Sequence, residues 1–182
     1  MKTLIIHPED RSTDFLCPIY SKIKGATVLR KNVSPAHLVN EIRRHDQILM
    51  MGHGSPYGLL NCAQIGKGSF SIEKKHASLL KKKRCIFIWC NVDEFVKQHQ
   101  LKGLYTGMFI SEVTEALTFK VHAEQEEVDA SNSSFSHILG ELLTAEEPNY
   151  NHIFERIKIS YGELAILNEV AAYNNERLYL NS

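Results

Sequence analysis

Short apolar runs alternate with stretches of helical periodicity along the first two thirds of the chain. Apolar runs of about four to eight residues, bounded by turn residues, are typical of buried strands. Five such runs occur, at Thr3 to His7, Ala26 to Leu29, Gln47 to Met51, Cys85 to Cys90 and Leu104 to Ile110. Strands that are apolar on both faces belong in the middle of a parallel sheet that is covered by helices.

The stretches between these strands carry signals for helix starts and stops. Ser34 followed by Pro35 is the strongest signal, because serine caps a helix and proline fits its first position. On such signals, helices are predicted over Ser12 to Lys24, Ser34 to about Arg44, Ser69 or Ser71 to Arg84, and Glu112 to Phe119, with a small hairpin or extended excursion over Tyr57 to Ile65.

The last third of the chain has weaker patterns. The acidic segment from Glu124 to Asn132 lacks periodicity, which favours a surface loop. The elements expected after it are a helix capped by Ser133 or Ser134 and broken by Pro148, one long helix or two from His152 to Tyr173, and a final strand from Arg177 to Leu180. The alternation of strands and helices predicts an α/β fold, a three-layer α/β/α sandwich with a mostly parallel central sheet of about six strands.

Composition narrows the class of protein. The 182 residues suit a single domain over 1–182, and the 43% of hydrophobic residues argue against a disordered chain. Because 21 basic residues balance 21 acidic ones, the chain has no basic footprint for nucleic acid. The apolar runs are far shorter than the roughly 18 residues of a membrane span, and the first is too short for a signal peptide. We therefore expect a cytoplasmic protein without a membrane or nucleic-acid partner.

The four cysteines are too sparse for a disulfide framework: Cys17, Cys62, Cys85 and Cys90. No CxxC, HxxxH or HExxH spacing occurs, so a zinc site is not expected. The phosphate-binding patterns GxxxxGK[ST] and GxGxxG are also missing, and we expect no cofactor. Taken one by one, each cysteine is expected to be a small buried apolar residue.

Two residues stand out because of where they lie. His53 follows the third predicted strand between two glycines, and Cys90 ends the fourth. Catalytic groups gather outside the carboxyl ends of parallel strands, so both side chains would reach the same edge of the sheet. An imidazole beside a thiol can act as its general base. Cys62 is a weaker rival for the nucleophile, since it does not end a strand.

The order of His-Gly and then a hydrophobic strand ending in Cys resembles the caspase-like superfamily of cysteine peptidases, which includes caspases, metacaspases, clostripains and CHAT domains. The matching segments are Ile48 to Gly54 and Ile86 to Cys90, and the helix start at Ser134 to Leu143 is a looser match. The resemblance covers roughly residues 1–145 in the order of elements.

This resemblance implies a cysteine endopeptidase that acts on a peptide or protein substrate. Cys90 would attack the scissile carbonyl, and His53 would transfer protons. The backbone N–H groups of Gly54 and Cys90 would hold the oxyanion. Such a reaction needs no metal and no organic cofactor.

Four further residues are expected to bind substrate at the same edge: Asp10, Asp14, Ser111 and Glu112. The two aspartates follow the first strand, where an acidic cluster would suit a basic side chain. Solvated loop carboxylates and helix caps are the alternative interpretation of these residues.

A catalytically inactive caspase-like binding or regulatory module is the main alternative function. It is motivated by Trp89, where many members of the superfamily carry a small residue, and by Asn91 to Glu94, where many carry Ser or Gly. A flavodoxin-like ligand-binding domain would fit the same alternation of elements. An exposed edge on the last strand would permit a homodimer.

Overall fold

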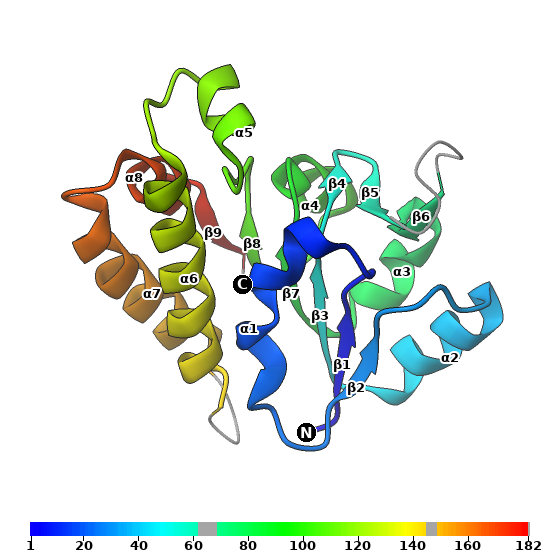
Figure 1. Cartoon of the computed structure of the whole chain (residues 1–182). Coiled ribbons are helices and arrows are strands. Elements are labelled where there is room, and N and C mark those ends of the chain that lie inside the picture. Colours follow the sequence, from blue (N-terminus) through cyan, green and yellow to red (C-terminus); the bar gives the residue numbers. More distant parts are fainter. Residues whose placement is uncertain (62–68, 145–148, 182) are drawn as a thin grey trace.

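The computed structural model describes residues 1–61, 69–144 and 149–181. A six-stranded sheet runs through the middle of this part of the chain (Figure 1). Its strands, in spatial order, are β2 (Thr27–Leu29), β1 (Thr3–Ile6), β3 (Gln47–Met51), β7 (Arg84–Ile88), β8 (Gly103–Thr106) and β9 (Leu178–Asn181). The first five are parallel and β9 is antiparallel to β8. The mostly parallel sheet of about six strands is therefore confirmed.

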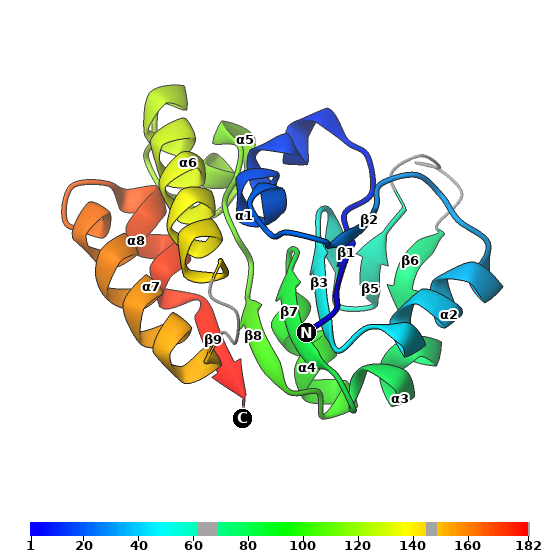
Figure 2. The same cartoon turned by 90° about the horizontal axis from the view of Figure 1, so that it is seen from below.

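Helices cover both faces of this sheet, which makes three layers (Figure 2). One face carries α2 (Pro35–Arg44), α3 (Ala77–Leu80) and α4 (Val92–His99). The opposite face carries η1 (Arg11–Leu16), α1 (Pro18–Ser21), α6 (Gln125–Leu142), α7 (Tyr150–Ala165) and α8 (Glu169–Glu176). Helix α5 (Val113–Thr118) follows β8 at the carboxyl edge.

Two apolar cores lie between these layers, because successive strand residues point to opposite faces. In β3, Ile48 and Met50 join the core under α2, α3 and α4, whereas Leu49 and Met51 join the core under α6 and α7. All four are completely buried. This double burial explains why the strands are continuous apolar runs in the sequence.

A second, small antiparallel sheet projects after β3. It contains β4 (Gly54–Ser55), β5 (Gly58–Leu60) and β6 (Phe70–Glu73). The hairpin expected near Tyr57 is thus present up to Leu60, while the remainder of that segment lies outside the described residues. The single helix predicted from Ser69 or Ser71 to Arg84 is wrong, because β6 pairs with β5 first and only η3 (Lys74–His76) and α3 are helical.

The loop predicted from Glu124 to Asn132 is wrong, and so is a cap at Ser133 or Ser134. Helix α6 begins at Gln125 and runs without a break to Leu142. A capping box formed by Glu124 and Glu127 starts it, and acidic residues suit the positive end of the helix dipole. Of the residues buried in its first half, Val128 is apolar but Ser131 and Asn132 are polar, so the sequence shows little hydrophobic periodicity there.

The helix predicted from Ser12 to Lys24 is also wrong in detail. Pro18 separates the 3-10 helix η1 from the single turn of α1, because proline favours the first turn of a new helix. The two alternatives for the segment from His152 to Tyr173 resolve in favour of two helices, α7 and α8. The final strand is confirmed as β9.

No described helix is long and apolar enough to cross a membrane.

One buried side chain fixes the backbone that follows β8. Asn174, on α8, has no exposed surface. Its Oδ1 accepts a hydrogen bond from Ile110 N at 2.7 Å, and its Nδ2 donates to Ile110 O at 2.8 Å. A single amide side chain therefore satisfies both backbone groups of Ile110, directly before Ser111 and Glu112.

Replacement of this amide should be costly. Asn174→Ala leaves a buried donor and a buried acceptor without partners, so the free energy of unfolding should fall by about 2–4 kcal/mol in urea denaturation. The matched control is Asn40→Ala on the exposed side of α2, which should change it by less than about 0.5 kcal/mol. Equal effects of the two substitutions would contradict this account of Asn174.

Candidate active site

The pairing of β3 with β7 brings His53 and Cys90 to the same edge. The parallel ladder ends at Met51 opposite Ile88, and Gly52 N still donates to Ile88 O at 3.0 Å. His53 and Cys90 each lie two residues beyond that last pair. Their backbone positions therefore correspond across two adjacent strands, at the carboxyl edge where ligands bind in sheets of this kind.

Trp89 fixes the turn that carries His53. Its indole belongs to the core under α2, α3 and α4, and its Nε1 donates to Ser55 O at 3.1 Å. A Cβ atom on Gly54 would lie 2.1 Å from Trp89 Cδ1, so only glycine fits under the indole. Trp89 thus supports the turn at His53 and Gly54 from the face of the sheet that α2, α3 and α4 cover.

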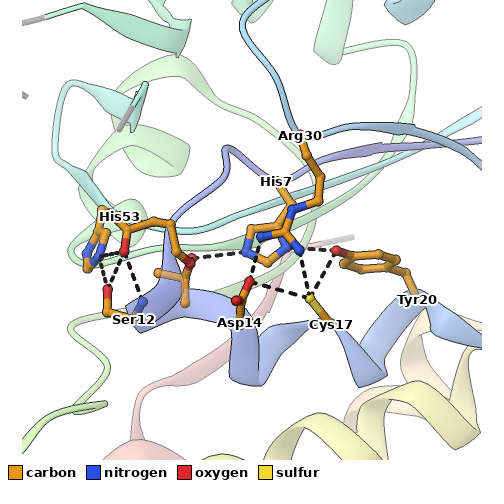
Figure 3. Close-up of polar contacts among 9 residues, drawn as sticks. His7, Ser12, Asp14, Cys17, Tyr20, Arg30 and His53 are labelled. Carbon is orange, nitrogen blue, oxygen red and sulfur yellow. Dashed lines mark hydrogen bonds and ion pairs between the residues drawn. The ribbon is translucent and has the colours of Figure 1, made fainter. Parts of the chain in front are cut away.

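Ser12 and Asp10 hold the imidazole of His53 (Figure 3). Ser12 Oγ lies 2.7 Å from His53 Nε2 and 2.8 Å from Asp10 Oδ1. A carboxylate can only accept, so the single hydroxyl proton goes to Asp10 and Ser12 accepts from His53 Nε2–H. His53 Nε2 is therefore the donor to Ser12, so in the neutral ring the proton is on Nε2 and Nδ1 is the basic nitrogen.

His7 also binds the 3-10 helix η1 (Figure 3). Its Nε2 lies 3.1 Å from Thr13 Oγ1, and its Nδ1 lies 3.0 Å from Tyr20 Oη. Burial, with a smaller effect of Arg30, lowers the pKa of His7 to about 4, so the ring is neutral at neutral pH. Two imidazoles thus hold η1: His53 binds Ser12, and His7 binds Thr13.

Cys90 has a different set of contacts. Its half-buried sulfur lies 3.8 Å from Phe109 O and 3.9 Å from Glu115 Oε1. Burial, followed by the Glu115 carboxylate, raises the pKa of the Cys90 thiol to about 12. Among the described residues no hydrogen bond joins Cys90 to His53, and the catalytic pairing of the two side chains stays a prediction.

Glu115 was not singled out by the sequence. Its Oε2 accepts from Ser111 N at 2.7 Å, from Ser111 Oγ at 3.1 Å and from Glu112 N at 3.2 Å. These bonds fix the carboxylate at the start of α5, within reach of the thiol. A glutamate at the third position of a helix is an ordinary capping residue, so nothing in the sequence connects it with Cys90.

Three of the four residues expected to bind substrate lie near the candidate active site, and the fourth, Asp14, does not. Ser111 and Glu112 line a hollow of about 430 Å³ between η1, α5 and α6, and Ser12 lines it too. Asp10 lies 3.9 Å from His53 Nε2. Asp14 points elsewhere, since its Oδ1 forms an ion pair with Arg30 Nη2 at 2.5 Å.

The remaining thiols differ in their surroundings. Cys85 lies in β7 with no exposed surface, and burial raises its pKa to about 12, as expected for a core residue. Cys17 is half-buried beside Arg30 Nη1, at 3.2 Å, and Tyr20 Oη, at 3.3 Å. Cys62, the rival nucleophile, lies outside the described residues.

Within the described ranges no group of three or more His, Cys, Asp or Glu side chains is arranged to hold a metal ion. Searches of the sequence against protein families and against curated proteins find no match.

The role of Ser12 can be tested on the His53 ring. Ser12→Ala removes the acceptor of Nε2–H, so the imidazole should change from one tautomer to a mixture of two. Long-range ¹H–¹⁵N NMR spectra of the neutral ring report this directly. The control is Ser78→Ala, an exposed serine on α3, which should leave the Nε2–H form unchanged. An unaltered His53 spectrum in Ser12→Ala would contradict the assignment.

The role of Glu115 can be tested on the Cys90 thiol. Glu115→Gln removes the negative charge that raises the pKa of Cys90, so more thiolate forms at a given pH. Alkylation of Cys90 by iodoacetamide near pH 8 should be faster by about three- to tenfold, followed by mass spectrometry of the tryptic peptide. Glu126→Gln, on the exposed start of α6, should leave the rate unchanged. The explanation fails if both variants react at the wild-type rate.

Proposed function

We propose that this protein is a caspase-like cysteine endopeptidase that uses His53 as general base and Cys90 as nucleophile. The observation that carries the proposal is the preorganised imidazole. His53 lies two residues beyond the end of β3, Ser12 accepts its Nε2–H at 2.7 Å, and its basic Nδ1 is left for proton transfer. A base that is oriented by a third group, beside a strand that ends in a thiol, is the arrangement nucleophilic catalysis requires.

The chemistry follows from these positions. Cys90 Sγ attacks the carbonyl carbon of the scissile bond while its proton passes to His53 Nδ1. The C–N bond then breaks, the amine leaves with that proton, and a thioester remains on Cys90. Water hydrolyses the thioester after giving a proton to His53, which returns it to the Cys90 sulfur. The N–H groups of Gly54 and Cys90 are the proposed oxyanion donors.

The Cys90 thiol is protonated before substrate binds, and the proposed general base explains how it can still react. With a pKa of about 12, Cys90 does not form a standing thiolate at neutral pH. Its proton must therefore leave during the attack itself, which is the work of a general base. Substrate in the cleft would also displace the sulfur from Glu115 and Phe109.

Turnover of a peptide library, with cleavage products identified by mass spectrometry, is the direct test. Cys90→Ala and His53→Ala should each lower the rate by at least about a thousandfold with unchanged thermal unfolding, since both side chains lie at strand ends. Cys17→Ala is the matched control at a thiol outside the edge and should retain activity. Full activity of Cys90→Ala would overturn the proposal.

A catalytically inactive binding or regulatory module is the second candidate. The raised pKa of Cys90 and its contacts with Glu115 and Phe109 favour it, because they stabilise the thiol rather than the thiolate. A peptide aldehyde that adds reversibly to catalytic thiols separates the two functions. Binding that disappears in Cys90→Ala supports the peptidase, whereas failure to bind at millimolar concentration supports the module.

A further inference from the structure

A second cavity lies away from the candidate active site. Its volume is about 520 Å³, within the range of small-molecule sites. It lies where β1 and β2 end, between the start of α2 and the β6–η3 segment. Neither His53 nor Cys90 nor Ser12 belongs to its lining. An occupant of this cavity would therefore be separate from a peptide bound at the carboxyl edge of β3 and β7.

The cavity has an apolar wall and a polar wall. The apolar wall comes from side chains that pack against the core under α2, among them Ile6, Leu29, Val33 and Leu38. The polar part of the lining has basic residues, one acidic residue and hydroxyl groups: Arg30, Lys31, Lys75, Glu73, Ser34, Ser69 and Ser71. A molecule with an apolar body and an anionic group would match both walls.

His76 lines this cavity with an unused hydrogen-bond donor. The residue is 2% exposed, and its Nδ1 accepts a hydrogen bond from Glu73 N at 3.1 Å. In the neutral ring, the proton must therefore be on Nε2. That nitrogen is buried and has no partner in the described part of the chain. Leaving a buried donor unsatisfied is costly, so an acceptor supplied by a ligand would stabilise it.

Arg30 also belongs to the lining of the cavity, while its guanidinium extends towards η1. Its terminal nitrogens are occupied by Asp14 and by Cys17, as Figure 3 shows. Its Nε is buried and has no partner among the residues described. Among the five buried side-chain atoms without a partner in the described ranges, two thus belong to residues that line this one cavity.

The start of α2 adds to the attraction for an anion. Ser34 caps this ten-residue helix, and its first turn lines the cavity at Pro35. Helix N-termini attract negative charge. Lys75 forms an ion pair with Glu73 at 2.6 Å, whereas Lys31 has no ion pair within the described chain.

We propose that this cavity binds a phosphate monoester with a compact apolar body. A phosphate presents three terminal oxygens, which suits a wall with several separate donors better than the two oxygens of a carboxylate do. The donors are His76 Nε2–H and the ammonium groups of Lys31 and Lys75, which reach the phosphate after small side-chain shifts. The organic group lies against the apolar wall near Leu38.

Phenyl phosphate is a suitable probe. Inorganic phosphate tests the anionic group alone, and benzyl alcohol tests the apolar body alone. In ¹H–¹⁵N NMR titrations of the full chain, phenyl phosphate should shift the amides of residues 30–34 and 70–76 and the Nε2–H signal of His76. Inorganic phosphate should shift the same signals at higher concentration, and benzyl alcohol should bind more weakly than phenyl phosphate.

A charge-matched pair of variants tests the assignment. Lys31→Ala/Lys75→Ala should weaken phenyl phosphate binding by about tenfold or more, since two favourable charge contacts are lost. Lys81→Ala/Lys82→Ala removes the same charge beyond the end of α3 and should leave binding unchanged. The proposal is overturned if phenyl phosphate causes no shift at these residues up to about 10 mM, or if both double variants weaken binding equally.

Discussion

The parallel pairing of β3 with β7 is the constraint on which the rest of the site depends. Both strands are buried on both faces, so a slip of the register by one residue would turn every core side chain to the wrong side. The register that the core enforces also sets the relation of His53 to Cys90, two residues beyond its last pair. The packing of the core thereby sets where the backbones of these two residues lie.

A network of polar side chains positions η1 and the imidazole of His53 at the edge of the sheet. His7 binds Thr13 and Tyr20, Ser12 binds His53, and η1 is held between them. This arrangement depends on pH. The pKa of His7 is about 4 in the folded protein and has its ordinary value of about 6.5 in the unfolded chain. The unfolded chain therefore binds more protons in that window, and stability is lost as pH falls through it.

The two hollows at the carboxyl edge differ in charge. The one beside the candidate active site has two acidic residues, Glu112 and Asp129, and one basic residue, Arg11, in its lining, and Glu115 raises the pKa of Cys90 close by. The cavity at the start of α2 has Arg30, Lys31 and Lys75. In a chain with no net charge, this separation gives the same edge an acidic side near η1 and α6 and a basic side near α2. Oppositely charged ligands would be directed to different places.

The sequence by itself determined the strands of the central sheet, the burial of its middle strands on both faces and the positions of His53 and Cys90 close to strand ends, because apolar runs and glycine turns are local signals. It could not determine the helical start of α6, where two of the buried residues, Ser131 and Asn132, are polar, or the break at Pro18. Only the tertiary structure decided that Ser12 orients His53, that Glu115 approaches Cys90, and that Arg30 and His76 share a cavity. These contacts join residues far apart in the chain, and their geometry is set by the packing of whole layers rather than by any local pattern.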